Sequence, residues 1–269
     1  MAKRNPSGQE SHERYLNRKS KPKPRALSGN AERGLEEHPT WLALLDIYPS
    51  LELIYELRSG KEATVYAVED EEGLWALKLY QDARIRTFQN DDLYQEGRTF
   101  ADQRAQKLKE EGRKLKVPLK QMRWIASEYD HLEKLCSNGV SLPKPRIHVG
   151  QAILMEWLGD VSGAAPRLAD LSPFEGAEGA FDQSVDQLTR MLQLGYVHGD
   201  YSAFNLLWWN ECVYAIDFPQ SVEIAKNPHW KMLLERDVQT LCMSFTRLGV
   251  RRDPKAILER MFQTLDAQA

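Results

Sequence analysis

The segment from His198 to Asp217 holds three side chains of the types that phosphoryl transfer requires. Asp200 and Asn205 lie within the run H-G-D-Y-S-A-F-N, and Asp217 follows in A-I-D-F. One carboxylate can orient or deprotonate an acceptor hydroxyl group, whereas an Asn and a second Asp offer the oxygen ligands that Mg²⁺ prefers. Asp and Asn also cap turns. The combined pattern is more specific than either residue alone, so we favour catalysis over capping.

The elements around these side chains must bring them together. Two apolar segments, residues 206–209 and 212–218, are separated by a predicted turn at Asn210-Glu211, which is the pattern of a β-hairpin. A hairpin returns the chain, so Asn205 and Asp217 should lie close together at its open end. The sequence therefore predicts that both carboxylates and the carboxamide converge.

The first half of the chain offers donors for the phosphate groups of a nucleotide. Residues 58–63 read R-S-G-K-E-A, a small turn in which backbone N–H groups near Ser59, Gly60 and Lys61 can approach phosphate oxygens. The alternative is that Gly60 serves only the turn. This motif by itself is weak evidence.

Lys78 is a charged residue within the apolar strand W-A-L-K-L-Y. A lone Lys in an alternating strand commonly faces water, but a buried ammonium needs a partner. Glu128 lies beside the apolar stripe of a predicted helix and is the candidate partner. Such a Lys–Glu pair holds the lysine over the α- and β-phosphates of a nucleotide.

The order of predicted elements divides the chain into a strand-rich first half and a helix-rich second half. Three consecutive antiparallel strands are expected at residues 51–57, 63–68 and 74–80, and further strands at 147–149 and 152–158. Apolar spacing predicts helices at residues 41–48, 122–136, 181–192 and 230–248. We therefore expect an α+β fold of two lobes joined near residues 155–159, with a cleft between them.

Two charged segments stand apart from these elements. Residues 1–25 contain eight Lys/Arg but only two Asp/Glu, and we expect residues 1–38 to form a disordered basic tail. Weak contact with RNA or a ribonucleoprotein is one interpretation of the tail; a solvated tail without a specific partner is the one we favour. Residues 82–119 are highly charged, and helix mixed with loop is expected there.

Composition excludes several classes of protein. The chain has 269 residues, of which 42% are hydrophobic and 28% charged, as in soluble globular proteins. Its three cysteines are too far apart for a C-x-x-C metal knuckle. No apolar run approaches the roughly 18 residues that span a bilayer. We therefore expect a cytoplasmic protein without membrane contact.

Taken together, the motifs resemble those of the RIO family of atypical serine/threonine protein kinases and ATPases. The matching pieces are S-G-K-E-A, A-L-K-L-Y, the helix glutamate in S-E-Y, M-E-W-L-G, H-G-D-Y-S-A-F-N and A-I-D-F-P-Q-S-V-E, within about residues 51–249. The resemblance implies a trimmed bilobal protein-kinase-like fold. Its N-lobe would be an antiparallel β-sheet lobe at residues 39–158 with a charged insert at about 82–119, and its C-lobe a mainly helical lobe at 159–269.

The resemblance also implies a role for each matching residue. Asp200 would be the catalytic aspartate, and Asn205 with Asp217 would hold Mg²⁺, with Mn²⁺ as the alternative metal. Lys78 and Glu128 would position ATP. In this family the aspartate that matches Asp217 can also accept phosphate transiently.

Backbone and loop contacts complete the site that the resemblance implies. Backbone groups of Glu156 and Leu158 would contact the adenine ring, and Ser59, Gly60 and Lys61 would lie over the phosphates.

The expected function is ATP- and Mg²⁺-dependent transfer of the γ-phosphate to a protein Ser/Thr, to the chain itself or to water. One alternative is a small-molecule phosphotransferase of the aminoglycoside or choline kinase kind, whose members share H-G-D-x-x-x-x-N and I-D-F. Another is an ATP-gated ribonucleoprotein assembly factor. The motifs S-G-K-E-A and P-Q-S-V-E favour the RIO interpretation.

Overall fold

The computed structural model describes residues 35–60, 62–81 and 119–267, with the backbone alone at 119–123. The predicted helix and loop at residues 82–118, most of the predicted tail, and Lys61 lie outside these ranges. Leu35 is buried in a cluster with Trp41 and Leu44. Ordered packing therefore begins by residue 35, before the tail boundary predicted at residue 38.

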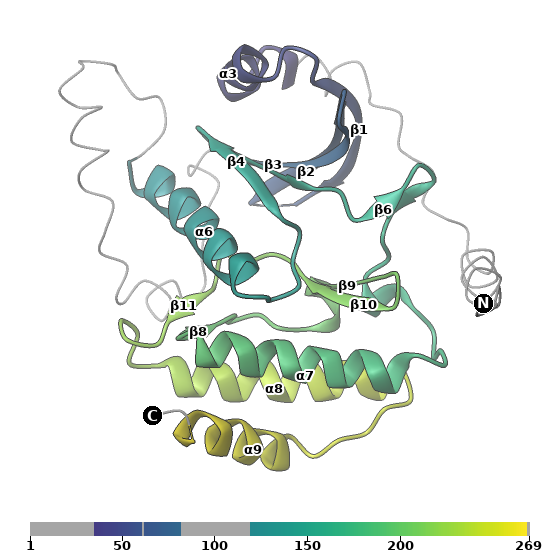
Figure 1. The fold of residues 1–269 in the computed structure, drawn as a ribbon, viewed down its shortest axis with the longest axis vertical. Coiled ribbons are helices and arrows are strands. Elements are labelled where there is room, and N and C mark those ends of the chain that lie inside the picture. The colour runs from purple at the N-terminus through teal and green to yellow at the C-terminus, as the bar shows by residue number, and fades with distance from the viewer. Residues whose placement is uncertain (1–34, 61, 82–118, 268–269) are drawn as a thin grey trace, which may run out of the picture.

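A five-stranded antiparallel sheet forms one half of the molecule (Figure 1). Its order is β1-β2-β3-β5-β4, with the bounds β1 Glu52–Ser59, β2 Ala63–Asp70, β3 Gly73–Tyr80, β4 Pro145–Val149 and β5 Ala152–Glu156. The predicted three-stranded sheet was incomplete, because β5 pairs with β3 and extends it. The strand predicted to continue to Leu158 ends at Glu156. Strand β3 is thus central, with neighbours on both sides.

The two faces of the sheet differ, because successive side chains of a strand point to opposite faces. Helix α3 (Pro39–Ile47) packs on one face, where Tyr66, Leu77 and Leu154 lie opposite one another on neighbouring strands. Lys78 and Tyr80 project from the other face. Helix α6 (Leu119–Ser137) lies next to β4 and β5 (Figure 1). It ends as predicted at Asn138-Gly139.

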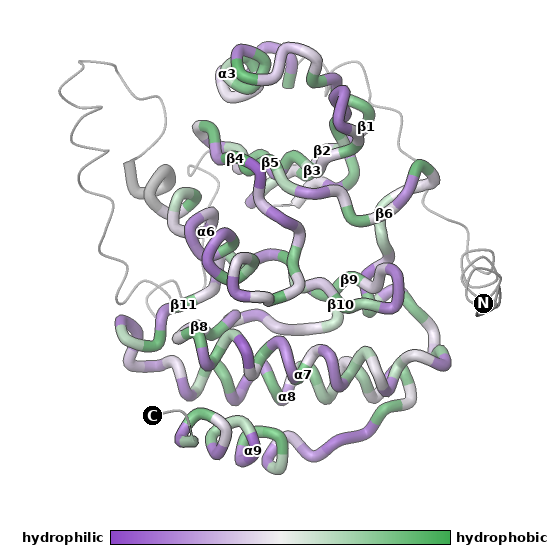
Figure 2. The backbone as a smooth tube through the Cα atoms, in the orientation of Figure 1, coloured by the Kyte–Doolittle hydropathy of each residue, from purple (hydrophilic) through white to green (hydrophobic). Residues whose placement is uncertain are grey.

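Helices and short strands build the second half of the molecule (Figure 1). Helices α7 and α8 lie side by side under the β9–β10 hairpin, and α9 packs below them. The bounds are α7 Ala177–Gln193, α8 Trp230–Thr246, α9 Pro254–Asp266, β6 Gly159–Asp160, β7 Gly163–Ala164, β8 Tyr196–Val197, β9 Leu206–Trp209, β10 Cys212–Ala215, β11 Val222–Glu223, and the 3₁₀ turns η2 Leu168–Asp170 and η3 Ala203–Asn205. Figure 2 shows apolar segments interleaved with polar ones along these helices, as amphipathic helices require.

Helix α9 was not predicted from the sequence. Its start signals were present, since the Asp253 side chain accepts the Lys255 N–H at 3.0 Å and Pro254 occupies the first helical position. Ile257 and Met261, four residues apart, are its buried positions. None of the helices in the described ranges is long and apolar enough to cross a bilayer.

The chain passes from β5 to the second half through a small hairpin, β6–β7. Gly159 has a φ of +143°, and a Cβ atom there would lie 2.4 Å from the Gly163 carbonyl oxygen. Glycine is therefore required by backbone conformation and by close approach together. Gly163 has a similar φ of +145° but no atom within 4 Å of an added Cβ.

This pair of glycines allows a matched test of the connection. We expect Gly159→Ala to lower the free energy of unfolding by about 1–3 kcal/mol more than Gly163→Ala, because only the former adds a clash to backbone strain. Chemical denaturation of both variants measures the difference. Equal destabilisation would show that steric contact at Gly159 is unimportant.

Candidate active site

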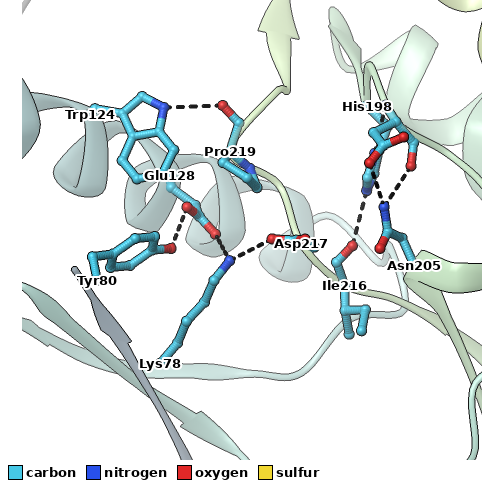
Figure 3. A network of polar contacts seen from close by, with 10 residues as sticks. Lys78, Tyr80, Trp124, Glu128, His198, Asn205, Ile216, Asp217 and Pro219 are labelled. Carbon is cyan, nitrogen blue, oxygen red and sulfur yellow. Dashed lines mark hydrogen bonds and ion pairs between the residues drawn. The ribbon is translucent and has the colours of Figure 1, made fainter. Parts of the chain in front are cut away.

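Lys78 is the centre of a polar network that joins three elements (Figure 3). Its Nζ lies 2.8 Å from Glu128 Oε1 on α6 and 2.8 Å from Asp217 Oδ1 on the segment after β10. The side chains of Lys78 and Glu128 are 12% and 2% exposed, whereas that of Asp217 is 47% exposed. The structure therefore brings the predicted Lys–Glu pair together and adds Asp217 to it.

The two carboxylates keep the buried ammonium charged. Burial alone would lower the pKa of Lys78, but the negative charges of Asp217 and Glu128 outweigh it and hold that pKa well above its ordinary value. Burial likewise acts to raise the pKa of Asp217, yet the adjacent Lys78 ammonium keeps it below its usual value. Lys78 and Asp217 are therefore both ionised at neutral pH.

Tyr80 and Trp124 hold this network in place from its buried side. The Tyr80 hydroxyl donates to Glu128 Oε2, and its ring meets Trp124 edge-on with centroids 5.1 Å apart. Trp124 Nε1 donates to the Pro219 carbonyl at 3.2 Å (Figure 3). Sequence reasoning missed Tyr80, although its position two residues after Lys78 on one strand places both on the same face.

Asp200 and Asn205 form a second polar group. Asn205 Nδ2 donates to the backbone carbonyl and to Oδ2 of Asp200, both at 2.9 Å. Both bonds use Nδ2, so they do not engage Asn205 Oδ1, which can act as an acceptor. The Asp200 side chain is exposed. Its pKa is raised above the ordinary value, because partial desolvation and the negative charge of Asp217 outweigh the hydrogen bond from Asn205, which lowers the pKa.

The β9–β10 hairpin brings Asn205 beside the Asp217 segment, as predicted. Leu206 pairs with Ala215 at its open end, and the Ile216 N–H donates to the Asn205 carbonyl at 2.9 Å. Asn210 and Glu211 form its turn with φ values of +49° and +61°, the geometry of a two-residue hairpin loop.

His198 connects the Asp200 loop to the Asp217 segment. It is fully buried; its Nε2–H donates to the Ile216 carbonyl at 3.2 Å, and its Nδ1 accepts the Asp200 N–H at 3.3 Å. Burial lowers the pKa of His198 to about 4. A neutral ring thus fixes the backbone next to both acidic residues.

Asp237, on α8, anchors the same loop from below. Its Oδ2 accepts the Gly199 N–H at 2.7 Å and its Oδ1 accepts the Tyr201 N–H at 3.0 Å, so the two bonds flank Asp200. The residue is 1% exposed, and burial raises its pKa to about 7. The only signal in the sequence was an acidic residue within the apolar stripe of a predicted helix, and sequence reasoning missed it.

The turn between β1 and β2 is held by hydrogen bonds between its own residues. The Gly60 N–H donates to the Ala63 carbonyl at 2.9 Å, and the Ser59 and Thr64 hydroxyl groups lie 3.1 Å apart. Lys61 lies outside the described residues. The contacts of Ser59, Gly60 and Lys61 with phosphate stay predictions.

The connection after β5 contains backbone groups of the two residues predicted to contact adenine. The Glu156 N–H already donates to the Lys144 carbonyl at 2.9 Å, and the Leu158 carbonyl accepts the Ala165 N–H at 2.8 Å. Within residues 35–60, 62–81 and 119–267, the Leu158 N–H has no hydrogen-bond partner. The contacts of Glu156 and Leu158 with an adenine ring stay predictions.

The donor set suits Mg²⁺. No group of three His, Cys, Asp or Glu side chains in the described ranges is arranged to hold a metal ion by itself. Asn205 Oδ1 and the exposed Asp217 carboxylate would offer two oxygen ligands, and Mg²⁺ commonly takes one or two protein oxygens together with phosphate oxygens and waters. The residues present therefore fit a metal that arrives with a nucleotide.

Comparison with known proteins identifies the family. A family model described as the RIO domain matches residues 64–257. This chain belongs to the RIO family. It is 33% identical to the RIO-type serine/threonine-protein kinase Rio1 of Thermoplasma acidophilum, over 68% of this chain and 91% of that one. It is 32% identical to serine/threonine-protein kinase rio1 of Schizosaccharomyces pombe, over 72% of this chain but 38% of that one. By family, this chain is a RIO-type protein kinase.

A solved structure with the same fold supports the kinase-like architecture. The Rio2 kinase of Chaetomium thermophilum, described as an ADP/Mg²⁺-phosphoaspartate complex, gives a TM-score of 0.60 at 21% identity. The match covers 87% of this chain and 74% of that one. The predicted trimmed bilobal α+β fold is confirmed.

Removal of the Tyr80 hydroxyl tests the buried side of the network. We expect Tyr80→Phe to lower the free energy of unfolding by about 1–3 kcal/mol, because Glu128 Oε2 then loses its donor in a buried position. Urea denaturation measures the change. Tyr66→Phe is the matched control, since Tyr66 is a buried tyrosine of the same sheet without a contact to Glu128. A loss no larger than that of the control would contradict the assigned contact.

The buried ring of His198 predicts a pH dependence. Its pKa is about 4 in the folded protein against 6.5 as the ordinary value, so the unfolded chain takes up a proton first as the pH falls. This group should leave stability unchanged above about pH 6.5 and lower it progressively between pH 6.5 and 4. In an NMR titration of the six histidines, the resonance of His198 is assigned as the one that is absent from the spectrum of the His198→Asn variant. It should show a neutral ring down to about pH 4. Protonation of that ring near pH 6.5 would refute the assignment.

Proposed function

We propose that this chain is an ATP- and Mg²⁺-dependent serine/threonine kinase or ATPase of the RIO type. It transfers the γ-phosphate of ATP to a protein Ser/Thr, to itself or to water. The observation that carries the proposal is the contact of one buried ammonium, Lys78, with both Glu128 and Asp217 at 2.8 Å. That contact joins the sheet, α6 and the segment after β10.

Lys78 and Glu128 position the nucleotide in this proposal. Because Glu128 is buried and also accepts a hydrogen bond from the Tyr80 hydroxyl group, it would keep the ammonium in place even if Asp217 bound a metal ion. Mg²⁺, when bound, would neutralise negative charge on the phosphate groups. Asn205 Oδ1 and Asp217 are its proposed ligands. The Leu158 N–H and the Glu156 backbone lie at the proposed adenine position.

Asp200 is the proposed catalytic carboxylate. It is exposed, and Asn205 fixes the orientation of its side chain through a hydrogen bond to Oδ2. Its raised pKa supports a role in accepting a proton from an incoming hydroxyl group. The bonds from Asp237 on either side hold the loop rigidly enough for such a role.

Asp217 is the proposed phosphate acceptor when the chain acts as an ATPase. The Rio2 kinase of Chaetomium thermophilum is described with a phosphoaspartate. Asp217 matches this chemistry, because its carboxylate is ionised and 47% exposed.

We propose that the boundary between the lobes lies at residues 155–159 and that the protein is located in the cytoplasm. Contact of the basic tail with RNA concerns residues outside the described ranges.

Substitution of the two aspartates separates binding from turnover. We expect Asp200→Ala to reduce phosphate transfer by at least about 100-fold while ATP affinity stays within about twofold. Asp217→Asn should abolish Mg²⁺-dependent transfer. The measurement is incubation with γ-labelled ATP and Mg²⁺, followed for free phosphate, label on the chain and label on added proteins or aminoglycosides.

Asp186→Ala is the control for this assay, because Asp186 is an exposed aspartate on helix α7, which carries none of the proposed site residues. Full activity in Asp200→Ala would remove the proposed catalytic role. Label that appears chiefly on aminoglycosides would replace the proposal with the small-molecule phosphotransferase alternative.

A further inference from the structure

The position of Arg58 in the sheet determines the face from which its side chain projects. It stands near the end of β1, opposite Val65 on β2, and Val65 in turn stands opposite Lys78 on β3. Residues directly opposite in an antiparallel sheet project from the same face. Arg58 therefore shares the face of Lys78, whose side chain extends from β3 to Glu128 and Asp217 (Figure 3).

A β-bulge in β1 places Arg58 in this row. Glu56 pairs with Tyr66, and Arg58 pairs with Val65, so Leu57 is the extra residue between them. Without the extra residue, Leu57 would stand opposite Val65, and Arg58 would turn to the face that α3 covers. Bulges commonly re-aim a side chain next to an active site. Here the bulge places the guanidinium group of Arg58, and not the apolar side chain of Leu57, opposite Val65.

The Arg58 guanidinium is exposed and has no protein partner among residues 35–60, 62–81 and 119–267. Arg146 provides the contrast, because its guanidinium bonds to Asp70 at 2.6 Å and to Glu72 at 2.9 Å on the same sheet. Arg58 is nevertheless close enough to Asp217 for its positive charge to help lower the pKa of that carboxyl group. It thus contributes positive charge to the place where phosphates are expected.

We propose that Arg58 binds the terminal phosphate of the nucleotide. This inference rests on the proposed function, and it adds a residue that lies outside the matched RIO domain at residues 64–257. Two strand spacings put the backbones of Arg58 and Lys78 about 10 Å apart. Lys78 then contacts the inner phosphates while Arg58 contacts the outer one. A planar guanidinium group with parallel N–H donors suits a terminal phosphate, which has three free oxygens.

The test compares nucleotides that differ by one phosphate. Isothermal titration calorimetry with Mg²⁺ would measure the affinities of adenylyl imidodiphosphate and ADP for the parent chain and for Arg58→Gln. We expect the triphosphate analogue to bind about 10-fold more weakly to the variant, and ADP to change by less than about twofold. Arg58→Lys should fall between the two, because it retains the charge but not the planar pair of donors.

Arg251→Gln is the matched control, since Arg251 is an exposed arginine in the segment before α9 and its loss changes net charge equally. It should leave both affinities unchanged. Equal losses for the two nucleotides in Arg58→Gln, or no loss, would overturn the role of Arg58 alone. A parent chain that binds neither nucleotide would overturn the proposed function and, with it, this inference.

Discussion

The ammonium group of Lys78 is largely buried and contacts two carboxylates, those of Glu128 and Asp217. Taking the charge of Lys78 out of water costs several kcal/mol unless carboxylates compensate for it. Its partners come from far away in the chain, Glu128 from 50 residues and Asp217 from 139 residues further on. The sheet, α6 and the segment after β10 must therefore meet at one point. A displacement of any of the three leaves a buried charge without its counterion.

The polar groups around this point divide into two sets by their exposure. Glu128, His198 and Asp237 are at most 3% exposed, and protein groups satisfy them as buried polar groups require. They hold side chains and backbone in place. Asp200 and Asp217, in contrast, are exposed. Rigid support under accessible carboxylates is the arrangement that pre-organised catalysis needs.

Much of the local structure was predictable, because its signals lie within a few residues. The turn at Asn210-Glu211 predicted the hairpin, and apolar spacing predicted α6 with Glu128 beside its buried stripe. The pairing of β5 with β3 was not predicted, because about seventy residues separate these strands and no local pattern records which strands become neighbours. Helix α9 had readable signals, namely Asp253 and Pro254 at its start, but they were overlooked.

The amino-acid sequence alone shows the carboxylates, the carboxamide, the lysine in an apolar strand and the family to which they point. Three features depend on how the distant parts of the chain pack: Asp237 bonds to the loop around Asp200, Tyr80 bonds to Glu128, and a bulge in β1 puts Arg58 on the face of Lys78. Periodicity and turn chemistry act over only a few residues. Cross-strand register and contacts between distant side chains are settled only when the whole chain packs.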